Sequence, residues 1–244
     1  MDSEETPRSY FQKWVDRKLS IAQRLLDGEL EGSYYDGTLI VSALIGGLAS
    51  IAWPRREGGD RRRFVEAWVR LAPASLGTDR ISLPLLISGL ETSRNADAAR
   101  KLRETNRAFS PGYDSLVIAG DEVDLSADRV KEIVPELDAA EIRKFSYGSV
   151  FYNEVRSSLM HEYQLGANAE AHAMAEKADG PSYVNRLDHS IFKPDDVTER
   201  RPVHFPYSWL EKVARGIAEK VEPFLTFEPA ERPSAPTVWW LHGG

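Results

Sequence analysis

Helical spacing of apolar residues covers most of the chain. Within Ser9–Leu30, apolar side chains recur at intervals of three and four residues, as in the buried stripe of an amphipathic helix. The same spacing predicts helices at 62–72, 93–109, 127–134, 138–166 and 206–225. Thr38–Trp53 is the most apolar stretch, also with helical spacing, and it is shorter than the ~20 residues of a membrane span. It predicts a buried core helix.

Capping residues indicate where two of these helices begin and end. Ser126 is a good N-cap for the helix at 127–134. Asp138, with Glu141 three residues later, has the spacing of a capping box at the start of the longest predicted helix. Gly166 is expected to end that helix, since glycine adopts the left-handed conformation common after a last turn.

Three segments have no clear helical pattern. Pro84 splits the apolar run 81–90, so a short helix and an extended piece both fit it. Residues 110–114, SPGYD, predict a turn, and residues 115–128 predict a short extended stretch.

These elements together predict an all-α fold, a helical bundle with irregular loop insertions. Without an internal repeat or a clear break, residues 1–228 are expected to form a single domain. Residues 229–244 are rich in proline and predict an extended or flexible C-terminal arm. Trp239 and Trp240 would be exposed on this arm and could dock on a partner.

Composition narrows the classes of function. The formal net charge is −7, so a global electrostatic attraction to nucleic acid is not expected, and any RNA contact must use a local basic patch. The absence of cysteine excludes disulfides, thiolate metal sites and cysteine nucleophiles. The N-terminal residues are acidic and polar and lack the pattern of a secretory signal. We expect a cytoplasmic protein that does not contact the membrane.

The stretch VRSSLMHEY, residues 155–163, carries the candidate chemistry. On a helix that turns about 100° per residue, Val155 and Leu159 share an apolar face, and Arg156 lies at its edge. The opposite face presents an amide, a hydroxyl, an imidazole and a carboxylate, from Asn153, Ser157, His161 and Glu154. Such a face can meet solvent, a partner helix or a phosphate.

Arginine and histidine together can cleave RNA without a metal ion. Histidine can act as a general base, so His161 could take the proton of a 2′-hydroxyl, which then attacks the adjacent phosphorus. The guanidinium of Arg156 can stabilise the added negative charge. A symmetric dimer that pairs these faces would supply one histidine as base and another as acid.

The order Arg156, four residues, His161, one residue, Tyr163 resembles the arginine–x4–histidine–x–tyrosine signature of HEPN domains. The chain looks most like the toxin ribonucleases of HEPN–nucleotidyltransferase toxin–antitoxin pairs. The longer context FSYGSVFYNEVRSSLMHEY is also similar to large, uncharacterised bacterial HEPN-like proteins. Ser157 departs from the pattern, since asparagine, aspartate or histidine follows the arginine in many active members.

The resemblance implies a HEPN-like helical bundle and a homodimer formed through the helix that carries residues 150–165. Arg156 and His161 would then be catalytic in a metal-independent endoribonuclease that needs no cofactor and serves toxin–antitoxin or phage-defence biology. Tyr163 would match the tyrosine that a partner nucleotidyltransferase modifies with AMP. RNA would be the substrate, and a nucleotidyltransferase antitoxin or another protein would be the partner.

A binding role is the alternative to catalysis. A non-catalytic HEPN-like module could bind a nucleotide, RNA or a protein through the same polar face. Ordinary structural roles also fit: a salt bridge for Arg156, a solvated or Glu154-bonded His161, and a core position for Tyr163.

The remaining candidate motifs have plainer interpretations. The other histidines lack the helical spacing of metal ligands, so no metal site is expected: His172, His189, His204 and His242. The basic cluster Arg55, Arg56 and Arg61–Arg63 predicts a solvated loop, although it could guide RNA. The pair Gly46–Gly47 indicates close helix packing.

Overall fold

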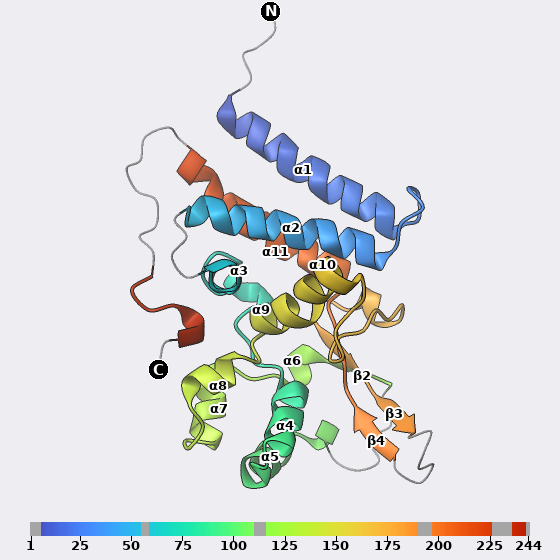
Figure 1. The fold of residues 1–244 in the computed structure, drawn as a ribbon, viewed down its shortest axis with the longest axis vertical. Helices are drawn as coiled ribbons and strands as arrows, with labels where there is room; N and C mark the ends of the chain where they lie inside the picture. Colours follow the sequence, from blue (N-terminus) through green and yellow to red (C-terminus); the bar gives the residue numbers. More distant parts are fainter. Residues whose placement is uncertain (1–5, 55–58, 110–115, 190–196, 226–235, 243–244) are drawn as a thin grey trace, which may run out of the picture. The chain divides into compact units, whose positions relative to one another are not determined.

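The computed structural model describes residues 6–54, 59–109, 116–189, 197–225 and 236–242 (Figure 1). Helices dominate it, with a few short strands, which agrees with the predicted all-α class, and the HEPN-like character of the bundle stays a prediction. The chain divides into two compact units. Unit 1 comprises Met1–Thr78, Arg156–Gln164 and a C-terminal part that begins at Tyr207, and unit 2 comprises Asp79–Val155 and Leu165–Pro206. The single domain over 1–228 stays a prediction.

Three long helices form the centre of unit 1. They are α1 (Pro7–Leu26), α2 (Tyr34–Ala52) and α11 (Tyr207–Val221), and α2 packs against both others (Figure 1). Leu19 and Leu48 are almost completely buried. The Tyr207 hydroxyl donates a hydrogen bond of 2.8 Å to the Leu19 carbonyl and so links α11 to α1. The amphipathic patterns predicted for α1 and α11 are therefore confirmed.

Helix α2 is long and apolar enough to cross a membrane, but a buried core helix can have the same length and composition. Of its most apolar window, 56% is buried inside unit 1, which confirms the predicted core helix. It begins four residues before the predicted start because Ser33 and Asp36 form a capping box. The Ser33 N–H donates to the Asp36 carboxylate at 2.8 Å.

Helix α3 (Gly59–Arg70) completes the core of unit 1 and leads into the 3₁₀ turn η1 (Ala74–Leu76). The buried rings of Trp68 and Trp209 lie 5.5 Å apart and join α3 to α11. Gly216 allows α11 to approach the turn closely, since a Cβ atom there would overlap the ring of Pro73. The helix predicted at 62–72 is confirmed, and because it begins at Gly59 it includes all of Arg61–Arg63, so the solvated loop predicted for this basic cluster is wrong there; Arg55 and Arg56 lie outside the described residues.

Residues 236–242 pack on the helices of unit 1. The 3₁₀ turn η6 (Trp240–His242) contacts α3, and the Trp240 N–H donates to the buried carboxylate of Glu66 at 2.7 Å. The Trp239 ring lies edge-on to Trp53 at 5.9 Å. The predicted exposure of Trp239 and Trp240 on a free arm is therefore wrong, because a buried acceptor and an aromatic partner hold them. All six tryptophans belong to unit 1: Trp14, Trp53, Trp68, Trp209, Trp239 and Trp240.

Unit 2 combines short helices with two small sheets. Its helices include α4 (Leu83–Thr92), α5 (Ala96–Arg103), α6 (Gly120–Val123), α7 (Ala127–Ile133), α8 (Ala139–Arg143) and α9 (Tyr147–Val150). The ambiguous run 81–90 is helical from Leu83 onward, because Pro84 falls in the first turn, where a missing N–H costs no hydrogen bond. The predicted cap of α7 is confirmed, since the Ser126 hydroxyl accepts the Arg129 N–H at 3.2 Å.

The strands of unit 2 are antiparallel. One sheet has the order β1 (Val117–Ala119), β2 (Ser182–Val184) and β5 (Val203–His204), and the other pairs β3 (Arg186–His189) with β4 (Val197–Arg200). In the first sheet, Tyr183 pairs with Ile118 on one side and with Val203 on the other. Strand β1 confirms part of the predicted extended stretch at 115–128, and the predicted turn at 110–114 lies outside the described residues.

A buried carboxylate lies in the core of unit 2. Asp124 accepts the hydroxyls of Tyr147 and Tyr183, each at 2.5 Å, and the N–H of Leu83 at 2.9 Å. The Tyr183 hydroxyl also contacts that of Ser82 at 2.8 Å. Burial raises the pKa of Asp124 to about 7, although the hydrogen bonds from Tyr147 and Tyr183 oppose the rise. We call this set of side chains the Asp124 cluster.

The single long helix predicted over 138–166 is wrong, because the run breaks at residues 144–146. The Ser82 N–H donates to the Phe145 carbonyl at 2.9 Å, and the Tyr147 N–H donates to the Arg80 carbonyl at 3.0 Å. These bridges to a distant segment replace helical hydrogen bonds. Asp138 does cap α8, accepting the Ala140 N–H at 3.1 Å.

Candidate functional site

The helical run that carries the Arg156–His161–Tyr163 motif changes geometry along its length. After α9, residues Phe151–Ser157 form a π-helix (η3), and α10 (Ser158–Glu162) follows. The boundary between the two units falls between Val155 and Arg156. A π-helix bonds each N–H to the fifth preceding carbonyl, so each residue turns the chain by less than in an α-helix. The predicted division into two faces is nevertheless confirmed, since Val155 and Leu159 are buried whereas Asn153 and His161 are exposed.

Arg156 is held between helices of unit 1. Its guanidinium pairs with the Asp60 carboxylate at 2.6 Å and lies 5.3 Å from the centre of the Phe64 ring. A Cβ atom at Gly46 on α2 would lie 3.4 Å from the guanidinium, so glycine leaves room there for the Arg156 side chain. The Arg156 side chain is only 18% exposed. Its geometry therefore matches the salt-bridge interpretation, and the catalytic role stays a prediction.

His161 lies in the last turn of α10 and is exposed. Ser157 is half-buried where the π-helix passes into α10, and its side chain makes no capping hydrogen bond to the helix. An exposed imidazole can exchange protons with solvent or with a substrate. Within unit 1, His161 is therefore the motif residue that is most accessible to act as acid or base.

Tyr163 ends the helix instead of packing in the core. Its backbone is left-handed, with φ of 53°, and its side chain is 54% exposed, so the core position predicted for it is wrong. The hydroxyl donates to Asp36, and the ring lies edge-on to Tyr35 at 6.5 Å. This hydrogen bond raises the pKa of Tyr163 and, together with those from Ser33, lowers the pKa of Asp36. Tyr163 therefore carries a neutral hydroxyl bound to the first turn of α2.

The other two candidate residues belong to unit 2. Asn153 is exposed, whereas Glu154 is half-buried and bound to the segment after the helix. The Glu154 carboxylate accepts the backbone N–H and the side-chain amide of Asn168, both at 3.1 Å. The Glu154 carbonyl accepts the Gly166 N–H at 2.6 Å. The predicted helix stop at Gly166 is wrong, since the helix ends at Glu162. A Cβ atom at Gly166 would overlap Glu154, so the close approach requires glycine.

Sequence reasoning missed the partners that fix the motif in unit 1. Asp36 had a usable signal, because it stands three residues after Ser33 in capping-box spacing. No sequence pattern pointed to Asp60 or Phe64, because they lie far from Arg156 in the sequence and contact it only through tertiary packing.

Replacing Arg156 with glutamine is expected to destabilise unit 1. The change removes an ion pair and a cation–π contact from a mostly buried position, at a cost of about 1–3 kcal/mol. Differential scanning calorimetry would measure the loss, and Asp60→Asn should shift the transition in the same direction. Unchanged stability of both variants would contradict the anchoring role.

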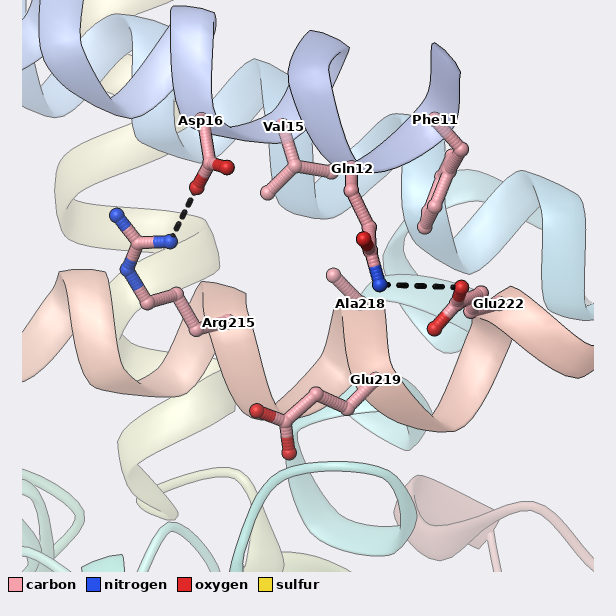
Figure 2. A pocket seen from close by; sticks show the side chains of 8 residues that line it. All are labelled: Phe11, Gln12, Val15, Asp16, Arg215, Ala218, Glu219 and Glu222. Atoms are coloured by element: carbon pink, nitrogen blue, oxygen red, sulfur yellow. Dashed lines mark hydrogen bonds and ion pairs between the residues drawn. The ribbon is translucent and has the colours of Figure 1, made fainter. Parts of the chain in front are cut away.

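A hollow in unit 1 lies between α1 and α11 (Figure 2). Its volume is about 200 Å³, and two contacts cross it: Arg215 to Asp16 at 2.5 Å and Gln12 to Glu222 at 3.2 Å. Three carboxylates and one guanidinium line it, from Asp16, Glu219, Glu222 and Arg215. This acidic lining disfavours a phosphate ligand. The two contacts across the hollow hold α1 against α11, so these side chains serve helix packing.

Among the described residues, no group of three or more His, Asp or Glu side chains is placed to hold a metal ion. No protein-family model, curated protein or solved structure matches the chain.

Proposed function

We propose that the chain is a metal-independent endoribonuclease of HEPN type that works as a homodimer. The observation that carries the proposal is the exposed imidazole of His161, one turn beyond a fixed guanidinium. Arg156–Gln164 belongs to unit 1, together with α1, α2, α3 and α11, although the segments on either side of it belong to unit 2. This arrangement fits a HEPN-like helical bundle that carries the motif, with the rest of the middle chain as an insertion.

The proposed reaction uses two copies of the helical run 150–165. His161 of one copy takes the 2′-hydroxyl proton, and the resulting oxyanion attacks the adjacent phosphorus. His161 of the other copy protonates the 5′-oxygen that leaves, so the products carry a 2′,3′-cyclic phosphate and a 5′-hydroxyl. Arg156 stabilises the charge on the phosphorane, with Asp60 fixing the orientation of its guanidinium. A cytoplasmic role in toxin–antitoxin or phage defence, with a nucleotidyltransferase partner, would fit this activity.

The direct test is incubation of the purified protein with a mixed RNA pool in EDTA. We expect cleavage with 2′,3′-cyclic phosphate ends and, by light scattering, the mass of a dimer. A well-folded dimer that leaves RNA intact, or products with 3′-hydroxyl ends, would count against the proposal. Cleavage that requires an added divalent cation would also contradict it.

The second candidate function is a non-catalytic binding module for a nucleotide, RNA or a protein. The ion pair between Arg156 and Asp60 favours it, because the Asp60 carboxylate already neutralises the guanidinium charge that would stabilise a phosphorane. Under this interpretation, His161→Ala changes the binding of RNA or protein, and neither the unchanged chain nor the variant cleaves RNA. The two candidates therefore differ in whether any RNA product forms.

A further inference from the structure

Unit 2 contains a groove that is independent of the motif in unit 1. It has a volume of about 350 Å³, within the low end of the range of small-molecule sites. Helix α4, the 3₁₀ turn η2 (Arg107–Phe109), residues 167–168 and the end of β4 contribute to it, as does Arg103 of α5. We call it the arginine groove, because Arg103, Arg200 and Arg201 line it.

The three guanidinium groups are held by separate parts of unit 2. Arg201 donates to the Asn185 side chain at 2.8 Å, and its guanidinium lies 5.3 Å from the centre of the buried Phe109 ring. Arg200 donates to the Ala167 carbonyl. Arg103 pairs with Glu91 at 2.8 Å, and this pair is partly exposed. Contacts of this kind restrict the side chains before a ligand arrives, which lowers the entropic cost of binding.

The lining is basic in a chain that is acidic as a whole. Among the described residues that line the groove, three carry a guanidinium and one, Glu91, carries a carboxylate, whereas the net charge of the chain is −7. The hollow between α1 and α11 has the opposite balance. The arginine groove is therefore a local basic patch of the kind that an acidic protein needs in order to bind an anion.

The walls also suit an organic body attached to the anion. Pro84, Ile87 and Pro202 provide apolar surface, and Ser88 and Thr92, one turn apart on α4, add hydroxyl groups. Guanidinium groups form charge-assisted hydrogen bonds with phosphate oxygens in a planar fork. We propose that the arginine groove binds a small organic phosphate, with the phosphate at Arg200 and Arg201 and the organic part against the apolar wall. This inference does not rest on the proposed ribonuclease activity.

Titration calorimetry with AMP at constant ionic strength tests the proposal on the whole chain. We expect saturable binding at one site per chain, with competition by inorganic phosphate and weaker binding of citrate. Combining Arg200→Gln with Arg201→Gln should weaken AMP binding by roughly tenfold or more, since each lost charge-assisted contact removes a large part of the affinity. Arg186→Gln is the matched control, because Arg186 pairs with Glu170 outside the groove.

Circular dichroism would check that each variant folds. If the double variant does not fold, Arg103→Gln tests the same groove from α5, and it should also weaken AMP binding. Absence of saturable AMP binding would overturn the proposal, as would an equal loss in Arg186→Gln. Citrate binding as tight as AMP binding would show a general anion site, and binding of an RNA oligonucleotide without AMP binding would show a nucleic-acid surface; either result would overturn it.

Discussion

Replacing His161 with alanine is expected to lower RNA cleavage at least about a hundredfold while leaving the fold unchanged. General acid–base catalysis by a positioned side chain contributes roughly 10²–10⁴ in rate, and this variant removes both the base and the acid of a dimer. His161 is exposed, so its truncation leaves no cavity in the core of unit 1. Single-turnover cleavage of a labelled RNA in EDTA, with calorimetry on the same samples, would measure both effects.

His172→Ala is the matched control for the loss of an imidazole, since His172 lies outside the motif and in unit 2. It should cleave RNA like the unchanged chain. Cleavage that survives in His161→Ala would show that the motif is not the active site. Loss of cleavage in Arg156→Gln alone would not separate catalysis from stability, because Arg156 also anchors the end of the π-helix to α3.

The stability of unit 2 is expected to fall as the pH rises from about 4 to about 7. In the folded chain the pKa of Asp124 is about 7, against an ordinary value of 3.8. Between these values the folded state holds a proton that the unfolded state has released, so raising the pH favours unfolding. The difference corresponds to about 4 kcal/mol, lost progressively as the pH rises through this window.

Urea unfolding followed by circular dichroism across this pH range would measure the effect. Other groups also titrate, so the quantity to compare is the free energy of unfolding of the unchanged chain minus that of Asp124→Asn. This difference should decrease with rising pH, because asparagine does not titrate. Asp121→Asn, three residues away and exposed, should leave the pH dependence in place. A pH-independent difference for Asp124→Asn would mean that Asp124 is ionised throughout.

Local patterns predicted the long helices because local rules govern them. The apolar stripes of α1, α2 and α11 and the Ser126 cap depend on neighbouring residues alone. The break at 144–146 could not be predicted in this way, because backbone groups of Arg80 and Ser82 compete for its hydrogen bonds. The π-helix is also hidden from a pattern that assumes 100° per residue.

The candidate site was predictable only as a set of residue types. The sequence pointed to Arg156, His161 and Tyr163, but the pairing of Arg156 with Asp60 depends on how α3 packs. The Asp124 cluster gave a faint signal, since Asp124 stands between the apolar residues Val123 and Leu125. No sequence pattern indicated the arginine groove, because Arg103 lies about a hundred residues before Arg200 and Arg201.

Because every tryptophan lies in unit 1, the natural fluorescence of the chain can show whether the two units unfold cooperatively. Indole emission follows the unfolding of unit 1, whereas unit 2 contributes helices and strands to the far-ultraviolet signal but no indole. In one denaturation experiment, indole emission therefore observes unit 1 alone, whereas the far-ultraviolet signal observes both units. Coincident curves would mean that the units melt as one body, and separated curves would give each unit its own midpoint without cutting the chain.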